Sequence, residues 1–281
     1  MTIYECYQST KKQLAAAGIE NGVQEAKELI RFITRYDNTQ ILTRYNEPLS
    51  VIQTALWKSL VKQRLTHVPL QYLIGEWDFY GFSFAVGEGV LVPRADTETL
   101  VDVAIEYLKE HPTARVADLC AGSGCIGISL AKRFGRSRVE LVEKYDTPVS
   151  YLETNLSRLK ADNATLTQAD LYEWNPREKA ELIVSNPPYI PADEMETINE
   201  EARHEPPEAL YGGEDGLNFY RLILSKIRDW LVPGGRLAVE VGKGQDESVR
   251  QLFAEAGMTE IGSREDLGGV QRVIFGTLPE V

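Results

Sequence analysis

The sequence predicts an α/β protein whose larger part is a mostly parallel sheet that ends in an antiparallel hairpin. A small N-terminal helical bundle precedes this part and is joined to it by a β-hairpin. Helical patterns fill residues 1–70, short apolar runs alternate with helical patterns from residue 114 onward, and two final runs flank Leu267-Gly268-Gly269. Such alternation is typical of βαβ units with parallel strands, and a short glycine turn typically joins antiparallel strands.

Composition excludes several classes of protein. The 281 residues are 43% hydrophobic and 26% charged, which is typical of a folded globular chain and not of a disordered one. Apolar runs fall short of the roughly 18 residues that span a membrane, and the N-terminus lacks the pattern of a signal peptide. Three cysteines, Cys6, Cys120 and Cys125, cannot all pair within the chain, so we expect reduced thiols and a cytoplasmic protein.

The net charge of −12 argues against a protein that binds nucleic acid through its phosphates. This charge is unevenly distributed. Residues 1–75 carry 9 basic and 6 acidic side chains, or +3, whereas the remainder carries −15. We interpret the difference in charge as two modules with different surfaces. The alternative is that the charged residues only form ordinary solvent-exposed faces with no further role.

Four helices are expected in the first module. Thr2-x-x-Glu5 and Asn21-x-x-Gln24 match capping boxes and predict helices over residues 3–17 and 22–36. A short helix over 39–45 and a longer one that begins after Ser50 follow. The residues expected on the inner faces are Val23, Ala26, Leu29, Ile30 and Ile33 in the second helix, and Val51, Ile52, Ala55, Leu56, Leu60 and Val61 in the last.

The rest of the chain follows a regular order. Residues 72–92 are rich in aromatic and branched residues broken by glycines, and they predict the connecting β-hairpin. Asp96 is expected to cap a helix over 97–110. The expected strands are 115–119, 138–142, 165–168, 182–185 and 236–241, the expected helices are 124–134, 148–159, 218–230 and 246–256, and the final hairpin pairs 258–264 with 270–276.

A glycine-rich loop lies between a predicted strand and a predicted helix. Gly122-x-Gly124-x-x-Gly127 permits a tight turn and lets backbone N–H groups approach a ligand closely. Glu143 ends the next strand, where a carboxylate can accept hydrogen bonds from both hydroxyls of a ribose. The pattern therefore indicates an adenosine-containing ligand, although a glycine turn can also serve only to pack a helix on a sheet.

The loop alone does not choose between a dinucleotide and S-adenosylmethionine, but Asp118 at a strand end favours S-adenosylmethionine. Asp118 is placed to meet the ligand's ammonium group directly or through water. Asp170 is placed to meet the adenine amino group, and Leu171 to cover the face of the ring. The alternative is that these aspartates cap turns, as strand-end aspartates also do.

The strongest motif is Asn186-Pro187-Pro188-Tyr189, which follows the predicted strand that ends at Ser185. Two prolines hold a rigid, extended exit at the carboxyl edge of the sheet, where ligands bind. An amide or aryl amine is a poor nucleophile because its lone pair is delocalised. The Asn186 side-chain oxygen and the Pro187 carbonyl can each accept one N–H of the target NH₂, and Tyr189 can lie against the flat target group. Catalysis is then mostly positioning, while the alternative reading is a structural proline turn.

The remaining candidates suggest no other chemistry. His67, His111 and His204 are scattered, so we expect no metal site. Cys120 and Cys125 flank the glycine loop, and we expect them to be packed there and not to act as nucleophiles.

Together these motifs resemble a known family. DLCAGSGCIGISLA followed by SNPPYIP is similar to class I methyltransferases that act on exocyclic or amide nitrogens. The segments at 69–101 and 204–223 resemble those of bacterial release-factor glutamine methyltransferases of the HemK/PrmC type. The resemblance covers about residues 68–281 well and the helical module loosely.

The resemblance implies a Rossmann-like class I methyltransferase sheet. Residues 1–70 would form a helical substrate-recognition domain, residues 71–92 a β-hairpin linker, and residues 93–281 the methyltransferase domain. The implied donor is S-adenosylmethionine, with S-adenosylhomocysteine as product. The implied substrate is the glutamine of the Gly-Gly-Gln tip of class 1 peptide release factors, methylated at N5. We expect a monomer that binds neither nucleic acid nor membrane.

The resemblance also assigns residues. It places the donor loop on Cys120, Ala121, Gly122, Ser123 and Gly124, the ribose carboxylate on Glu143, and the adenine contacts on Asp170 and Leu171. With Asp118 and Asn186 these residues form the expected donor site, and the implied target site comprises Asn186, Pro187, Pro188 and Tyr189. Of these, Asn186, Pro187 and Tyr189 are the expected catalytic residues. Three positions depart from the family pattern: Cys120-Ala121 stands where Gly-Thr is usual, Glu143 where Asp is commoner, and Ala95 where proline is usual.

Three other functions remain open at this point. One is glutamine methylation of a ribosomal protein, within the same family. Another is adenine-N6 methylation of DNA or RNA, which uses similar chemistry but is opposed by the net charge of −12. The third is a catalytically inert binding module, which the intact Asn186, Gly122 and Gly124 oppose.

Overall fold

The computed structural model describes residues 1–280 and divides them into two compact units. The first unit consists of Met1–Glu76 together with a later segment, Asn199–His204. The second consists of Trp77–Ile198 and the chain from Glu205 onward. Within the described residues, helices long and apolar enough to cross a membrane are absent.

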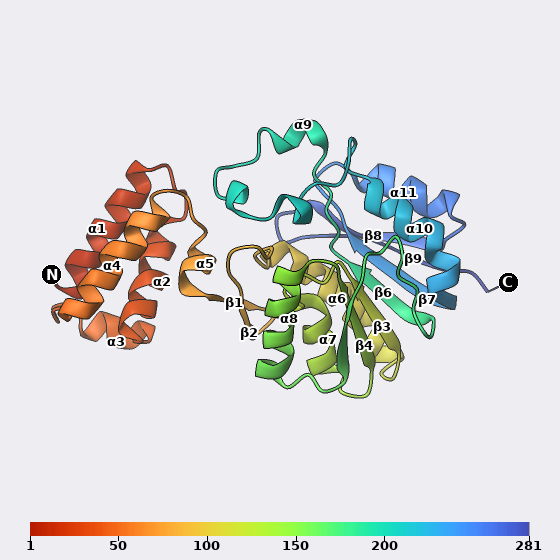
Figure 1. Cartoon of the computed structure of the whole chain (residues 1–281), viewed down its shortest axis with the longest axis horizontal. Coiled ribbons are helices and arrows are strands. Elements are labelled where there is room, and N and C mark those ends of the chain that lie inside the picture. Colours follow the sequence, from red (N-terminus) through yellow and green to blue (C-terminus); the bar gives the residue numbers. More distant parts are fainter. Residues whose placement is uncertain (281) are drawn as a thin grey trace. The chain divides into compact units, whose positions relative to one another are not determined.

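The first unit is built of helices. These are α1 (Ile3–Ala16), α2 (Gly22–Thr34), α3 (Asn38–Thr43), α4 (Val51–Arg64) and α5 (Leu70–Ile74) (Figure 1). The capping box at Thr2 and Glu5 is confirmed, and Asp37 and Ser50 begin α3 and α4 in the same way. The capping box expected at Asn21 is wrong. The backbone of Asn21 is not extended (φ −90°, ψ 23°), and its side chain makes no capping hydrogen bond.

The predicted inner faces of α2 and α4 are partly wrong. Ala26, Leu29, Ile30 and Ile33 are buried in α2, but Val23 is 55% exposed. In α4 the buried residues are Trp57, Leu60, Val61 and Arg64. The first two turns of α4 lie outside that face, which leaves Val51 88% and Ile52 81% exposed, with Ala55 and Leu56 also exposed.

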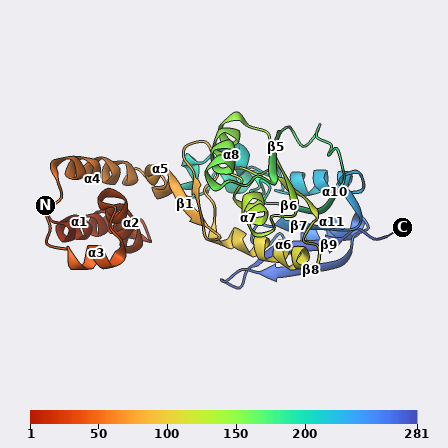
Figure 2. The same ribbon diagram turned by 90° about the horizontal axis from the view of Figure 1, so that it is seen from below.

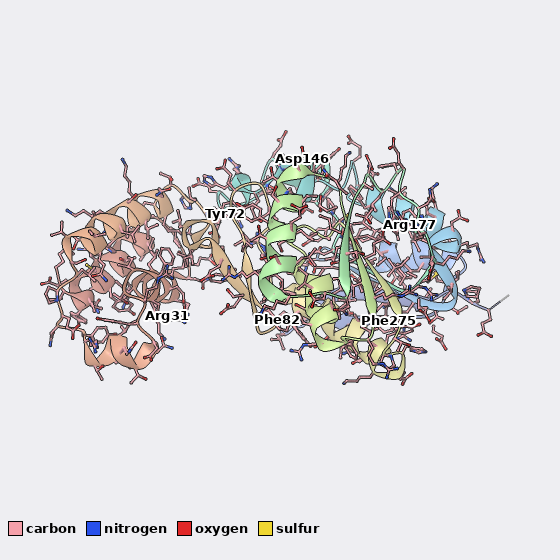
Figure 3. All side chains as sticks on the ribbon, turned by 60° about the horizontal axis from the view of Figure 1, so that its bottom comes forward. Arg31, Tyr72, Phe82, Asp146, Arg177 and Phe275 are labelled. Atoms are coloured by element: carbon pink, nitrogen blue, oxygen red, sulfur yellow. The ribbon has the colours of Figure 1, made fainter. Side chains whose placement is uncertain are left out.

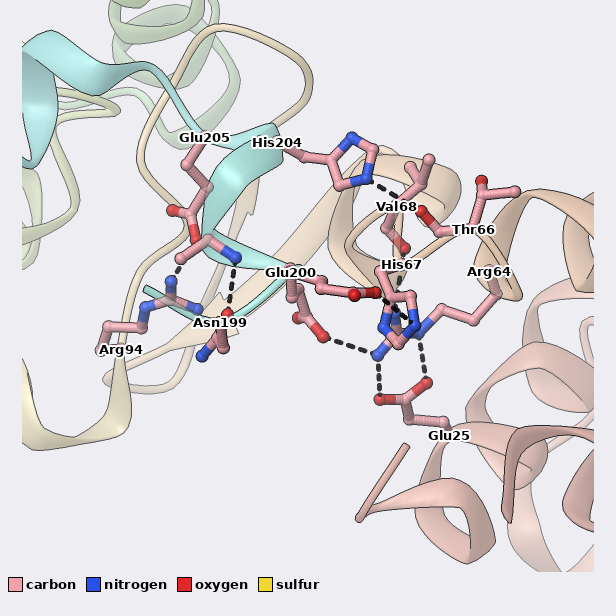
Figure 4. A network of polar contacts seen from close by, with 12 residues as sticks. Glu25, Arg64, Thr66, His67, Val68, Arg94, Asn199, Glu200, His204 and Glu205 are labelled. Carbon is pink, nitrogen blue, oxygen red and sulfur yellow. Dashed lines mark hydrogen bonds and ion pairs between the residues drawn. The ribbon is translucent and has the colours of Figure 1, made fainter. Parts of the chain in front are cut away.

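A buried arginine organises the first unit. The Arg64 side chain is only 1% exposed, and it donates to both carboxylate oxygens of Glu25 (2.6 and 2.9 Å) and to Glu201 (2.6 Å). His204 lies in the same network, with its ring Nε2 2.9 Å from the carbonyl oxygen of Thr66 (Figure 4). Because a buried guanidinium is costly without partners, these carboxylates account for the inclusion of Asn199–His204 in the helical unit.

The connecting hairpin is shorter than predicted. Residues 70–74 form the helix α5, which Pro69 precedes and Gly75 terminates, so the hairpin predicted over 72–92 is wrong for residues 72–74. The hairpin itself pairs β1 (Glu76–Phe79) with β2 (Phe82–Ala85).

The second unit contains the predicted mostly parallel sheet with an antiparallel end. Its strands are β3 (Arg115–Leu119), β4 (Arg138–Glu143), β5 (Ala164–Gln168), β6 (Ala180–Ser185), β7 (Leu231–Glu240), β8 (Thr259–Glu265) and β9 (Gln271–Thr277). Their order is β5-β4-β3-β6-β7-β9-β8, and only β9 pairs antiparallel with β7 and β8. The strands β5 and β8 form the two edges of the sheet (Figure 2). The predicted fold class is confirmed.

Helices cover both faces of this sheet. The main ones are α6 (Glu98–Glu110), α7 (Cys125–Arg133), α8 (Asp146–Leu159), α10 (Asn218–Trp230) and α11 (Asp246–Glu255), with a short α9 (Ala192–Met195) in a loop. One apolar core joins α6, α7 and α8 to the sheet, and a second joins α10 and α11 to its other face. In the side-chain view, Phe275 marks the sheet and Asp146 the start of α8 (Figure 3). Asp96 makes no side-chain cap, because the 3₁₀ turn Ala95–Thr97 precedes α6.

The strand order fixes the position of the functional site. The chain leaves β3 toward β4 on one side and later returns to place β6 on the other side, so β3 and β6 are neighbours at the point where the order reverses. Ligands bind at the carboxyl ends of the strands beside such a reversal. Leu119 pairs with Ser185 at these ends, directly before the glycine loop and Asn186.

Removal of one partner of the buried arginine should destabilise the helical unit. We expect Glu25→Ala to lower the free energy of unfolding by about 3 kcal/mol, because Arg64 keeps only Glu201 as a charged partner. Chemical denaturation followed by circular dichroism measures this. Glu28→Ala is the control, since its pair with the exposed Arg31 should contribute less than about 1 kcal/mol. Equal losses in the two variants would contradict the role given to Arg64.

Candidate active site

A pocket of about 990 Å³, open to solvent, lies at the carboxyl edge of the sheet in the second unit. It brings together most of the predicted site residues. Its walls include Cys120, Ala121, Gly122, Ser123, Glu143, Asp170, Leu171, Asn186 and Pro188. Asp118, Gly124, Pro187 and Tyr189 are not among the residues that line it.

The glycine loop joins β3 to α7 along one wall of the pocket. Gly122 has φ +55° and Gly124 has φ +81°, both in the left-handed region. A Cβ at Gly122 would meet no atom within 4 Å, whereas one at Gly124 would meet Ile128 and Leu152 at 2.9 and 3.1 Å. Gly122 therefore leaves space on the pocket side, and Gly124 lets the loop pack on the core below it.

Cys120 also adopts the left-handed conformation, with φ +58°. This region favours glycine, the residue that is usual at this position in the family that the sequence resembles. Burial raises the pKa of the Cys120 thiol far above its ordinary value and that of Cys125 to about 12. Both thiols are therefore protonated at neutral pH, in agreement with packing and not with nucleophilic chemistry.

Glu143 ties the loop to the end of β4. One carboxylate oxygen accepts from the backbone N–H of Gly122 (2.9 Å), and the other accepts from the backbone N–H groups of Lys144 (2.7 Å) and Tyr145 (3.0 Å). A carboxylate offers about four acceptor sites, so these three hydrogen bonds leave capacity for a ligand hydroxyl. Glu143 is 7% exposed and lines the pocket, which fits the predicted contact with a ribose.

Asp118 lies beneath the loop and not in the pocket wall. It is fully buried, and its Oδ2 accepts from the backbone N–H of Gly127 at 2.8 Å. Its Oδ1 has no hydrogen-bond partner among residues 1–280. Burial raises the pKa of Asp118 to about 7, so this carboxyl would become more acidic if a cationic group approached. The predicted contact with an ammonium group remains a prediction.

Asp170, Leu171 and Lys144 also line the pocket. The Lys144 ammonium lies 2.8 Å from the Asp170 carboxylate and lowers the pKa of that carboxyl, helped by the backbone N–H of Tyr172. Leu171 is 5% exposed and presents an apolar surface. Asp170 is thus held in its ionised, hydrogen-bond-accepting form, which suits the predicted contact with an amino group.

The Asn-Pro-Pro-Tyr segment, which follows β6, borders the same pocket. Asn186 Nδ2 donates to Thr97 Oγ1 at 3.2 Å, and Pro188 lines the wall. The Tyr189 hydroxyl donates to Glu240 Oε1 at 3.4 Å, and the carbonyl oxygen of Tyr189 accepts from Gln245 Nε2 at 2.8 Å. Tyr189 is therefore anchored at both its ring and its backbone, and its predicted stacking on the target group remains a prediction.

Sequence reasoning missed several residues of the pocket. Thr97 stands beside Asn186, and Arg94 forms an ion pair with Glu205. The pattern PRADTE before the α6 helix was the available signal for Thr97 and Arg94. The other missed lining residues are Leu91, Val92, Pro93, Cys125, Ile126, Val142, Lys144, Tyr145, Pro148, Ala169, Tyr172, Pro206, Glu208, Ala209 and Phe219. Leu91 and Val92 lie before residue 93, so the site extends beyond the range predicted for the methyltransferase domain.

Comparison with known proteins decides the family. The PrmC N-terminal domain model matches residues 5–75, and the methyltransferase small domain model matches residues 95–213. A release factor glutamine methyltransferase of Geobacter sulfurreducens is 37% identical over 99% of this chain and 97% of its own length. The chain belongs to the release factor glutamine methyltransferase family. Another member, from Thermodesulfovibrio yellowstonii, is 35% identical over 90% of this chain and 91% of its own.

Solved structures agree with this family fold. A methyltransferase of Pyrococcus furiosus matches with a TM-score of 0.52 at 16% identity, covering 72% of this chain and 91% of that one. A ribosomal protein L11 methylase of Lactobacillus delbrueckii matches with a TM-score of 0.51 at 18% identity, covering 69% and 84%. At these identities the similarity establishes the class I methyltransferase fold alone.

The two loop glycines should respond differently to substitution. We expect Gly122→Ala to weaken binding of S-adenosylmethionine at least tenfold, because the methyl group projects into the open space by the pocket, and to lower the free energy of unfolding only by the roughly 1 kcal/mol that a side chain costs at positive φ. Gly124→Ala should instead destabilise the fold, because its methyl group meets buried side chains of the core. Calorimetric titration and thermal unfolding of both variants measure this. Unchanged donor binding by a folded Gly122→Ala would contradict the placement of the donor beside Gly122.

Proposed function

We propose that this chain methylates the side-chain amide nitrogen of the glutamine in the Gly-Gly-Gln motif of class 1 peptide release factors. The observation that carries the proposal is one pocket that unites the glycine loop and Glu143 with Asn186 and Pro188. The family membership of the chain supports the choice of glutamine and of release factors as substrates. S-adenosylmethionine is the methyl donor of this enzyme and supplies an electrophilic methyl group.

The residues of the pocket fit this donor. Gly122 leaves room for close approach, Glu143 retains acceptor capacity for ribose hydroxyls, and Leu171 offers an apolar face for the adenine ring. The buried Asp118 carboxyl near the loop has an unpartnered Oδ1, and a cationic ligand group would favour its ionised form. These features together favour an adenosine carrying a cationic group over a neutral ligand.

The target amide needs orientation more than it needs a base. Its nitrogen carries two hydrogens, and the Asn186 side-chain oxygen and the Pro187 carbonyl are the proposed acceptors. Binding both hydrogens in a fixed plane turns the nitrogen lone pair toward the methyl group. The hydrogen bonds of Tyr189 to Glu240 and Gln245 hold the Asn-Pro-Pro-Tyr segment in place. The catalytic contribution of Asn186, Pro187 and Tyr189 is then preorganisation.

Charge distinguishes the proposed substrate from nucleic acid. The net charge of −12 disfavours association with a polyanion, so adenine-N6 methylation is the weaker alternative. Glutamine methylation of a ribosomal protein remains the alternative within the family. We further propose that the enzyme acts in the cytoplasm as a monomer, on release factors as its protein substrate.

A transfer assay tests the proposal directly. The full chain is incubated with methyl-labelled S-adenosylmethionine and, in separate reactions, a class 1 release factor, a ribosomal protein fraction and a DNA duplex. We expect label in the release factor, and mass spectrometry should place it on the glutamine of the tip peptide. Label only in the ribosomal fraction or only in the duplex would replace the proposal with the corresponding alternative.

Substitution of Asn186 should slow methyl transfer and spare donor binding. We expect Asn186→Ala to lower kcat by about 10²–10³, the usual effect of losing one preorganised partner, with little change in donor affinity. Single-turnover methylation and calorimetry measure the two effects. Asn21→Ala is the matched control, since Asn21 is exposed and caps no helix through its side chain. A loss below tenfold would mean that Asn186 does not hold the target nitrogen.

The helical domain of residues 1–70 is the proposed second contact for the release factor. Its helix α4 exposes Val51 and Ile52 almost completely, together with Leu56. Exposed apolar side chains that adjoin on one helix are suited to binding a protein partner. A second contact would raise the effective concentration of a mobile tip at Asn186.

Loss of this apolar surface should affect binding of the intact substrate alone. We expect the double variant Val51→Ser/Ile52→Ser to raise KM for the intact release factor at least fivefold and to leave methylation of a short tip peptide unchanged. Lys12→Ser, which removes another large exposed side chain of the same unit, is the control. An unchanged KM in the double variant would favour the alternative that these helices only stabilise the fold.

A further inference from the structure

The loop of residues 205–216 packs against the chain that leaves the target motif. The backbone N–H of Ile190 donates to the carbonyl oxygen of Leu210 (2.8 Å), and the N–H of Gly212 donates to the carbonyl oxygen of Ile190 (2.9 Å). The fit is close, since a Cβ at Gly212 would lie 2.7 Å from the Cα of Tyr189. The position of this loop therefore bears directly on the position of the Asn-Pro-Pro-Tyr segment.

The same loop forms part of the pocket wall. Pro206, Glu208 and Ala209 line the pocket that Asn186 also lines. A short 3₁₀ turn over Pro207–Ala209 shapes this part of the wall, and the backbone N–H of Ala209 donates to the carbonyl oxygen of Pro206 (2.9 Å). A turn this short makes few hydrogen bonds within itself, so contacts outside the turn have to fix its position.

Glu205, directly before this part of the wall, is held by both of its carboxylate oxygens. Its side chain is fully buried, its Oε2 accepts from the backbone N–H of Val92 (3.0 Å), and its Oε1 accepts from the guanidinium of Arg94 (Figure 4). Val92 and Arg94 also line the pocket, on the segment that leads to the contact between Thr97 and Asn186. Two contacts from one carboxylate fix both the distance and the direction between the two segments, which a single contact would not.

We propose that Glu205 is a positioning residue of the target site, which through its ion pair with Arg94 holds the adjoining pocket wall where the target glutamine meets Asn186. The inference rests on the proposed function for the identity of the target. Stability alone does not account for such a pair, because apolar side chains of similar volume often stabilise a protein as well as a buried ion pair does. An ion pair differs in that its partners have to meet at defined atoms, so it specifies one arrangement of the two segments.

Two substitutions separate the positioning role from stability. Arg94→Met leaves a buried carboxylate without its guanidinium, so the midpoint of thermal unfolding should fall by at least about 5 °C. In Glu205→Gln the midpoint should fall by less than half as much, because the Arg94 side chain is 40% exposed and can turn to solvent. Both variants lose the ion pair, so both should lower kcat/KM for the release factor by about 30-fold. Glu205→Gln should keep its affinity for S-adenosylmethionine within twofold, since the loop packs on the target motif.

The double variant Arg94→Met/Glu205→Gln provides the decisive test. With neither charge present, stability should return to that of Glu205→Gln, whereas kcat/KM should remain low because the ion pair is still absent. The two losses of activity should not add, since both residues act through one contact. Arg94→Lys keeps a cation at this position and should recover most of the rate. The control is Arg264→Met/Glu106→Gln, which removes another ion pair of the same unit whose arginine side chain is also 40% exposed, and it should leave kcat/KM unchanged.

Each outcome bears on one claim. Kinetics are measured with the full chain and an intact class 1 release factor, and donor affinity by calorimetry. The positioning role is overturned if Glu205→Gln keeps kcat/KM within threefold, if its donor affinity falls as much as its kcat/KM, or if kcat/KM recovers together with stability in the double variant. If the wild-type enzyme labels a ribosomal protein and not a release factor, the proposed function fails, and the same variants assayed on that protein decide the positioning role.

Discussion

The pairing of β3 with β6 is the contact on which the site depends. These strands are separated by more than 60 residues in sequence, yet Leu119 and Ser185 are partners at their ends, and the Ser185 hydroxyl donates to the carbonyl oxygen of Leu119 at 2.7 Å. The donor loop follows one strand and the target motif follows the other. The parallel pairing therefore places the donor loop and the target motif at the same edge of the sheet. A shift of the pairing by one residue would turn every side chain of the displaced strand to the other face of the sheet.

The site is rigid because backbone groups, and not only side chains, are engaged around it. Glu143 accepts from the backbone N–H groups of Gly122, Lys144 and Tyr145, and Gln245 fixes the carbonyl oxygen of Tyr189. Hydrogen bonds of this kind restrain the course of the chain itself. The proposed reaction needs orientation of the target more than acid–base chemistry. A restrained backbone therefore contributes to catalysis by holding the reacting groups in position.

Much of the architecture could be predicted from sequence because local patterns and topology agree. The strand that ends at Leu119 and the helix over 218–230 were predicted with the bounds that the structure has. Local patterns failed where burial depends on distant partners. Val51 and Ile52 have the spacing of core residues, but the face of α4 that packs inward is set by Trp57, whose indole N–H donates to Thr10. The contact between Thr97 and Asn186 depends on distant partners in the same way, since 89 residues separate the two and the fold brings the start of α6 beside the end of β6.

The buried Arg64 has a consequence for how this protein can be divided. Its partner Glu201 belongs to a segment that the chain reaches long after the helices have been completed. The helical unit is therefore discontinuous in sequence, and no single cut releases it whole. A chimaera that exchanges this unit between relatives has to exchange residues near 199–204 as well, or it will leave a guanidinium group in the interior with half of its counter-charge.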